Sequence, residues 1–292
     1  MKRKLVKHGD ITLMVSLPAQ WVKQHSLKQG DDIELISKDN TLVLSGKGTA
    51  SLKTTQIQVT KENLPNLRTA IASAYKAGYD EIALLYTVQP SLDQLNTIVS
   101  SFTGLEIVSQ TAEQCIIKSF LSKETDETEQ LIIKMFQITK LVAETLVTNW
   151  QNTDLENIQT LVKINNMKLR DHCLRMIHLN NHGGDKSYDY YDLVTVLEKI
   201  TAQYYLLAED IVKKKIKKTM CVENQIHFIQ ELYEAFLKKD LKKTYAMRVE
   251  LKQYESKCLA QISKENVVVL MHHYYLLNLY KHISSRLISI NS

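Results

Sequence analysis

Basic side chains near the N-terminus are the clearest chemical feature of the sequence. Residues 1–28 contain one acidic residue and six basic ones, namely Lys2, Arg3, Lys4, Lys7, Lys23 and Lys28. Such an excess of cations favours an anionic partner, and each DNA phosphate that a lysine or arginine neutralises adds about −0.9 to the log–log salt slope of binding. Because only Arg3 offers a bidentate guanidinium for reading bases, we expect phosphate contacts and little sequence specificity.

A basic edge that is merely solvated, and that protects a strand against aggregation, is the alternative interpretation of these residues. The densest basic run of the chain is Lys213-Lys214-Lys215-Ile216-Lys217-Lys218. It lies at the predicted C-terminus of a helix, where cations interact favourably with the helix dipole. We interpret this run as a solvated helix end, with a second contact to DNA or to an anionic membrane as the alternative.

Histidines and cysteines do not form a recognisable site. The four cysteines, Cys115, Cys173, Cys221 and Cys258, are far apart and include no CxxC pair, which argues against a disulfide framework and a zinc site. His272 and His273 are neighbours that point to different sides of a helix. His172 and Cys173 diverge in the same way and have no obvious orienting acid. The sequence therefore predicts no enzyme, no catalytic residue and no cofactor.

Composition indicates a helical protein of the cytoplasm. Of 292 residues, 44% are hydrophobic and 24% are charged, and only 8 glycines and 3 prolines interrupt the chain. So few helix breakers favour long helices. The longest stretch without charge, residues 266–280, contains His272, His273 and Asn278 and is shorter than the ~20 apolar residues of a membrane span. We expect no membrane insertion, no signal peptide and a cytoplasmic location.

Residues 1–48 have the pattern of a small β-module. Strands are predicted at residues 4–8 and 11–17, with Gly9-Asp10 as their turn, and again at 33–36 and 41–44, with Asp39-Asn40 as theirs. Pro18 ends the second strand and opens a short helix over residues 19–25. The predicted order is therefore hairpin, short helix, hairpin.

Residues 49–122 alternate strands and helices. Strands are predicted at 54–59, 81–86, 105–109 and 114–120, with helices over 63–76 and from Pro90-Ser91 to Phe102. This β-α-β-α-β-β order indicates a small α+β unit that links the flanking segments. No glycine-rich phosphate loop follows the early strands, so nucleotide binding is not predicted.

Residues 123–292 are predicted to form a bundle of about five long helices. The apolar periodicity places them at residues 124–150, 155–179, 188–218, 222–262 and 266–290, the fourth being one helix or two. Thr125 or Thr128 is the expected cap of the first helix. The last helix is apolar nearly all round at its start, so we expect it at the centre of the bundle or in a subunit contact.

The run Leu13-Met14-Val15-Ser16-Leu17-Pro18-Ala19-Gln20-Trp21-Val22, followed by Leu27-Lys28-Gln29-Gly30-Asp31, resembles the AbrB/SpoVT swapped-hairpin family. The resemblance implies that two chains interlace their hairpins into one β-barrel, which commonly binds DNA through basic residues. Residues 1–48 are accordingly expected to be a DNA-binding and dimerisation domain. A segment of this length cannot bury enough surface alone, and oligomerisation is a usual remedy.

Two later helices resemble those of PhoU domains. The matching residues are Leu197-Glu198-Lys199-Ile200 with Ala208-Glu209-Asp210-Ile211, and Glu234-Ala235-Phe236 with Asp240 and Ala246. In this order behind the first module, they resemble fused phosphate-uptake regulators found mainly in archaea. The resemblance implies a homodimer that binds DNA and regulates phosphate uptake in response to phosphate. The alternative is a dimeric adaptor that does not bind DNA and docks on a phosphate transporter or signalling protein through its helical bundle.

Many PhoU domains bind metal clusters on an acidic helix stripe, which needs carboxylates four residues apart. Here Glu198 is followed at that spacing by Ala202, and the stripe continues as Tyr205 and Glu209. The last helix offers Leu277 and Lys281 instead. Glu198 is therefore only a weak candidate ligand, and we expect no metal site.

Overall fold

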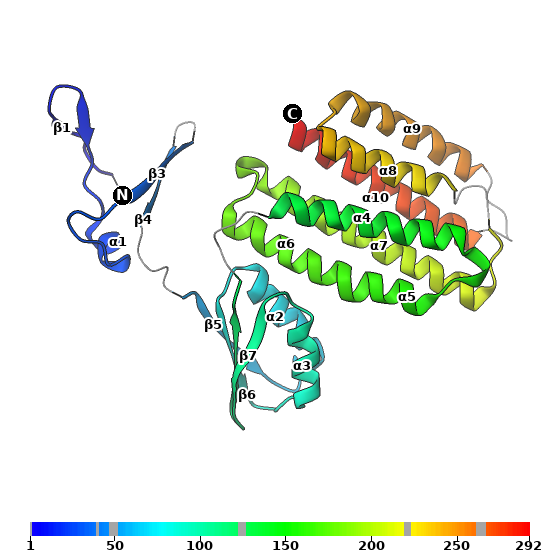
Figure 1. The fold of residues 1–292 in the computed structure, drawn as a ribbon, viewed down its shortest axis with the longest axis horizontal. Coiled ribbons are helices and arrows are strands. Elements are labelled where there is room, and N and C mark those ends of the chain that lie inside the picture. Colours follow the sequence, from blue (N-terminus) through cyan, green and yellow to red (C-terminus); the bar gives the residue numbers. More distant parts are fainter. Residues whose placement is uncertain (1, 39–40, 47–51, 122–126, 219–222, 261–266) are drawn as a thin grey trace. The chain divides into compact units, whose positions relative to one another are not determined.

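The computed structural model describes residues 2–38, 41–46, 52–121, 127–218, 223–260 and 267–292. Contacts divide the chain into two compact units, Met1–Lys53 and Thr54–Ser292 (Figure 1). The domain boundaries expected after residues 48 and 122 lie outside the described residues, as does the predicted turn at Asp39-Asn40.

The first unit has the predicted order of hairpin, helix and hairpin. Its elements are β1 (Val6–His8), β2 (Thr12–Met14), α1 (Ala19–Gln24), β3 (Ile33–Lys38) and β4 (Thr41–Gly46). Both pairs are antiparallel, and they form two separate two-stranded sheets. Gly9 turns the first hairpin with a φ of 71°, a value that suits glycine. The described residues of a single chain therefore form hairpins and not a closed barrel.

The second unit begins with a four-stranded sheet and two helices, in the predicted β-α-β-α-β-β order. Its elements are β5 (Thr54–Val59), α2 (Leu67–Lys76), β6 (Glu81–Tyr86), α3 (Leu92–Ser100), β7 (Leu105–Gln110) and β8 (Gln114–Ser119). The strand order is β5-β6-β8-β7, with β5 and β6 parallel and the other pairs antiparallel. Ser91 caps α3 because its hydroxyl accepts from the Gln94 backbone N–H.

This α/β part has its own apolar core. Ile71 and Tyr75 of α2 and Leu95 of α3 are buried together with Leu84 of the central strand β6. The Tyr75 ring lies 5.2 Å from that of Phe102, and its hydroxyl donates to the Thr103 carbonyl. The core therefore lies between the sheet and the two helices, as the alternating apolar positions require.

The helical part follows. Its helices are α4 (Thr128–Thr148), α5 (Leu155–Gln159), a π-helical stretch (Thr160–Asn166), α6 (Met167–Asn180), α7 (Ser187–Lys214), α8 (Glu223–Lys238), α9 (Leu241–Leu259) and α10 (Val267–Asn291). The long helix α10 packs against α7, α8 and α9, as its apolar sequence predicts. Within the described part of the chain, no helix is both long and apolar enough to cross a membrane.

Two predictions about helix ends are wrong, and the alternative of two helices after residue 222 is confirmed. Thr128 does not cap α4: it is buried in the first turn, and Glu127 occupies the cap position. Helix α7 ends at Lys214 and not at residue 218, because Lys215 takes a left-handed conformation. The region expected as one helix or two is divided at Lys239, which is also left-handed, and Asp240 caps α9 by accepting from the Lys243 N–H. Thr125 lies outside the described residues.

A buried arginine joins the α/β part to the helices. Arg175 of α6 is 1% exposed, and one guanidinium nitrogen donates to the carbonyls of Tyr75 and Tyr79 over 2.7 and 2.9 Å. Its other terminal nitrogen lies 3.5 Å from the buried carboxylate of Asp80. The guanidinium also lies over the Tyr75 ring, 4.9 Å from its centroid. Burial lowers the pKa of Arg175 from its ordinary value, with Asp80 acting in the opposite direction.

We predict that Arg175→Met destabilises the protein by about 3–5 kcal/mol, because it removes the guanidinium from a buried ion pair with the Asp80 carboxylate. Chemical denaturation followed by circular dichroism measures the loss. Lys168→Met is the matched control. Lys168 also reaches from α6 to the α/β part, donating to the Ser100 carbonyl, but this contact is exposed, and its loss should cost no more than about 1 kcal/mol. Equal losses would contradict the role assigned to Arg175.

Candidate nucleic-acid interface

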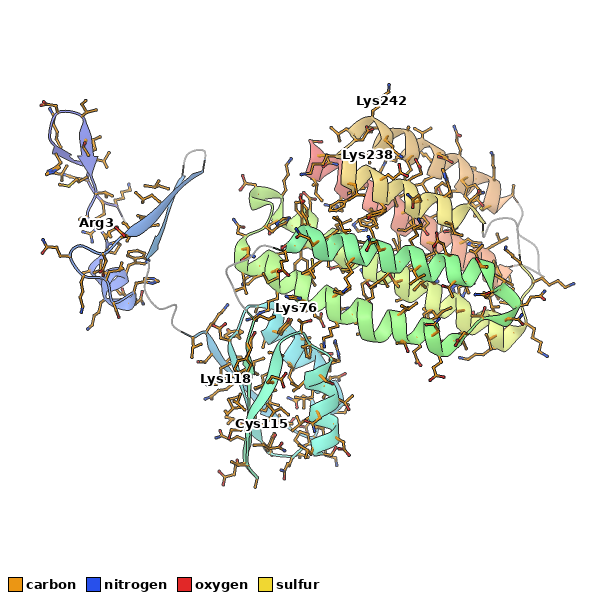
Figure 2. The ribbon with its side chains drawn as sticks, in the orientation of Figure 1. Arg3, Lys76, Cys115, Lys118, Lys238 and Lys242 are labelled. Atoms are coloured by element: carbon orange, nitrogen blue, oxygen red, sulfur yellow. The ribbon has the colours of Figure 1, made fainter. Side chains whose placement is uncertain are left out.

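The basic residues predicted to contact DNA all lie exposed on the first unit. They are Lys2, Arg3 and Lys4 before β1, Lys7 within it, Lys23 in α1 and Lys28 after α1. Arg3 is labelled in Figure 2. Among the described residues, none of the six has an ion-pair partner. Their charges are therefore not compensated within the described chain, and they can meet an external anion.

The first unit exposes most of its apolar side chains whose burial is described. Among the residues of this unit whose burial is described, none is buried, and several large apolar side chains are more than half exposed, including Leu5, Val6, Ile11, Leu13, Leu35 and Leu42. A hollow of about 270 Å³ lies among Leu17, Val22, Leu27 and Ile33. Hairpins with this much exposed apolar surface need another surface to cover them.

Glu198, the weak metal candidate, is already paired with a cation. Its carboxylate lies 3.3 Å from the guanidinium of Arg170, and both side chains are largely buried. Arg170 also binds Asp171, which in turn pairs with Arg68 of α2 at 3.0 Å. These four residues form an ion-pair chain that runs from α7 through α6 to the α/β part. No three His, Cys, Asp or Glu residues in the described ranges are grouped to hold a metal.

The rest of the expected stripe also has protein partners. Ala202 packs against the apolar core, and the Tyr205 hydroxyl donates to Glu209 over 3.1 Å. On α10, Leu277 is buried and the Lys281 ammonium lies 2.6 Å from the Glu255 carboxylate. The stripe therefore serves packing and ion pairing in this structure.

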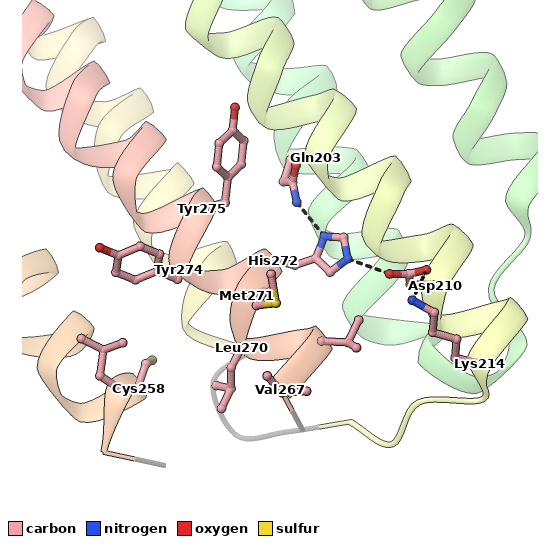
Figure 3. Close-up of a pocket in the computed structure, with 12 residues that line it drawn as sticks. Gln203, Asp210, Lys214, Cys258, Val267, Leu270, Met271, His272, Tyr274 and Tyr275 are labelled. Carbon is pink, nitrogen blue, oxygen red and sulfur yellow. Dashed lines mark hydrogen bonds and ion pairs between the residues drawn. The ribbon is translucent and has the colours of Figure 1, made fainter. Parts of the chain in front are cut away.

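The sequence did not reveal a polar cluster around His272, shown in Figure 3. The Gln203 amide nitrogen lies 2.6 Å from Nδ1 of His272, and Nε2 lies 3.1 Å from an oxygen of Asp210. The other Asp210 oxygen pairs with Lys214 at 3.0 Å. A neutral imidazole that accepts from Gln203 and donates to Asp210 satisfies both contacts. The spacing of Gln203, Asp210 and Lys214 along one helical face was the available signal.

The neighbouring His273 points into the core, as expected for adjacent histidines in a helix. It is fully buried, and neither ring nitrogen has a hydrogen-bond partner in the structure. Burial, with a smaller electrostatic contribution from the adjacent His272, lowers the pKa of His273 to about 4. The imidazole is therefore neutral in the folded protein at physiological pH.

We predict that His273 makes the fold sensitive to acid. Its folded pKa lies below the value of about 6.5 for an unfolded chain, so unfolding takes up a proton between these two values. Stability is therefore lost as pH falls from about 6.5 to 4, by up to about 3 kcal/mol from this group. His273→Phe should reduce this pH dependence in denaturation experiments. His227→Gln, at an exposed histidine, should leave it unchanged.

Comparison with known protein families gives a match within the first unit. Residues 9–50 match the family model described as antidote-toxin recognition MazE, bacterial antitoxin. Among solved structures, the phosphate transport system regulatory protein PhoU from Streptococcus pneumoniae is similar at 13% identity, with a TM-score of 0.40, over 56% of this chain and 90% of that chain. No curated protein matches the chain. The chain thus has a MazE/AbrB-like module at residues 9–50.

Proposed function

We propose that this protein is a regulator that binds DNA as a homodimer through its MazE/AbrB-like module and responds to phosphate. The observation that carries the proposal is the family match of residues 9–50 on a unit in which the six basic residues between positions 2 and 28 are all exposed. Lysine and arginine side chains without internal partners neutralise DNA phosphates without first losing an ion pair. In a dimer, the same surface would carry two copies of the six charges.

The homodimer is supported by the exposed apolar faces of the hairpins. Leu13 is 59% exposed and Leu35 is 56% exposed, so both sheets present apolar side chains to solvent in one chain. Burying such surface stabilises association by roughly 25 cal/mol for each Å² removed from water. A second copy of the module offers the same apolar faces, and pairing two copies would bury apolar side chains that are exposed in a single chain.

The phosphate response rests on the sequence resemblance of α7 and α8 to PhoU helices and on the order of the segments. In the structure, Leu197, Ile200, Ala208 and Ile211 of the α7 motif are buried in the bundle. The α7 residues that resemble the PhoU motif are therefore residues that pack in the core. They support a helical bundle like that of PhoU domains, and we propose in addition that this bundle responds to phosphate.

An adaptor that dimerises without binding DNA is the second candidate. Five of the six exposed cations are lysines, and Arg3 alone offers a planar, bidentate contact. An adaptor would use the first unit only for dimerisation and the helices for docking on a transporter or signalling protein. Loss of the N-terminal positive charges would weaken a DNA-binding protein, whereas an adaptor would keep its protein partner.

We predict that Lys4→Gln/Lys7→Gln weakens binding of the full chain to duplex DNA and reduces its log–log salt slope by about 3.6 per dimer, because two lysines are lost from each of two copies. Fluorescence anisotropy at several salt concentrations measures both. Lys238→Gln/Lys242→Gln is the control, since these lysines lie on the second unit and are exposed (Figure 2). The absence of wild-type binding at low salt would refute DNA binding and favour the adaptor.

We also predict that Leu13→Asp disrupts the dimer, because the new carboxylate would be buried between the two modules. Light scattering at micromolar concentration should give a dimer for the wild type and a smaller species for the variant. Val249→Asp on α9 is matched in exposure, at 58% against 59%, and should remain dimeric. A folded wild-type monomer would rule out the dimer.

A further inference from the structure

A cavity of about 640 Å³ lies among α7, α9 and α10, far in sequence from the proposed DNA-binding residues (Figure 3). Its walls are mostly apolar and are formed by Leu259, Val267, Val268, Leu270 and Met271, with the Cys258 thiol beside them. Cavities of roughly 300–1,000 Å³ with apolar walls and a few polar groups are typical of small-ligand sites. The dimensions and lining therefore suit a small ligand that is largely apolar.

The apolar character continues from the wall to the rim of the cavity. Three apolar or aromatic residues lie close together on α10: Met271 is 68% exposed, Tyr274 is 45% exposed and Tyr275 is 47% exposed. Leu259, at the end of α9, is 48% exposed. Neighbouring exposed apolar side chains at the rim of a cavity favour occupation by an apolar group.

The polar end of the cavity is formed by Gln203, His272, Asp210 and Lys214. Both ring nitrogens of His272 and both oxygens of Asp210 are engaged within this cluster. The hydrogen bond from His272, together with Lys214, lowers the pKa of Asp210, so its carboxylate stays ionised and compensated. Lys214 is 53% exposed and keeps further N–H donors for a ligand.

The polar end also lies at the start of the lysine run. Residues 209–218 contain five lysines against Glu209 and Asp210, which gives a net charge of +3. Lys213 forms only an exposed pair with Glu209, and Lys215 and Lys217 are exposed. An apolar cavity that opens beside such an excess of cations is complementary to a molecule with an apolar body and an anionic head.

We propose that this cavity binds a monomeric, single-chain anionic amphiphile, such as a long-chain carboxylate. The hydrocarbon chain lies against Leu270, Met271 and Val267, and the carboxylate lies at Lys214. Removal of the chain from water supplies the affinity, and the lysine supplies the preference for an anion. This binding is independent of the proposed DNA contact, because no cavity residue belongs to the first unit.

Binding of the fluorescent fatty acid cis-parinarate to the full chain tests the proposal, with non-fluorescent amphiphiles as competitors below their micellar concentrations. Dodecanoate should displace the probe, and dodecyltrimethylammonium, which has an equal chain and the opposite charge, should not. Met271→Asp should weaken probe binding by about tenfold or more, because a carboxylate then meets the hydrocarbon chain. Lys214→Gln should weaken it by about threefold to tenfold.

Three controls separate this cavity from other surfaces. Tyr245→Asp changes an exposed apolar residue on α9 that does not line the cavity. Lys238→Gln removes a lysine that, like Lys214, pairs with an acid four residues earlier. Leu13→Asp changes the exposed apolar face of the first unit. All three variants should bind cis-parinarate as the wild type does, and circular dichroism checks that every variant is folded.

Several results would overturn the proposal. Equal displacement by the cationic amphiphile would remove the anionic selectivity, and unchanged binding by Met271→Asp would place the probe elsewhere. Loss of binding in Leu13→Asp would assign the probe to the hairpin faces. Flotation of the chain with anionic vesicles, without displacement by dodecanoate, would indicate a membrane surface instead. DNA affinity measured on Met271→Asp should be unchanged, so failure of this proposal and failure of DNA binding are distinguishable.

Discussion

The buried guanidinium of Arg175 is the constraint on which the second unit depends. An arginine remains charged in proteins, so its burial requires acceptors that surround it in a fixed geometry. The carbonyls of Tyr75 and Tyr79 and the carboxylate of Asp80 provide them. The acceptors run from Tyr75 in the last turn of α2 to Asp80 just before β6, so one side chain of α6 holds the turn that leads into the central strand. The α/β part and the helices therefore form one compact unit.

The two units differ in the source of their stability. The second unit has large apolar cores, with side chains such as Ile71 and Phe136 removed from solvent. In the first unit no side chain of described burial is buried, and several large apolar side chains are more than half exposed. The proposals of dimerisation and of DNA binding both concern the first unit, because its hairpins expose apolar side chains as well as cations.

In the helical part, most of the acidic residues and histidines considered as candidate ligands are paired with other side chains or enclosed in the core. Glu198 pairs with Arg170, and His273 is neutral and enclosed in the core. His272 is different, because its hydrogen bonds to Gln203 and Asp210 lie at the polar end of an open cavity. In this protein, a polar residue is therefore a candidate for ligand binding only where the packing of the helices leaves it at a cavity.

The order of strands and helices could be predicted from the sequence, since apolar periodicity, Pro18 and the Gly9-Asp10 turn act over a few residues. The α/β part follows that order from Thr54 to Ser119. Helix ends were less predictable, because the left-handed residues Lys215 and Lys239 have no strong local signal. The pairing of Arg175 with Asp80 and of His272 with Gln203 could not be predicted in this way. Each pair is separated by many residues, and helix packing, which depends on the whole core, brings them together.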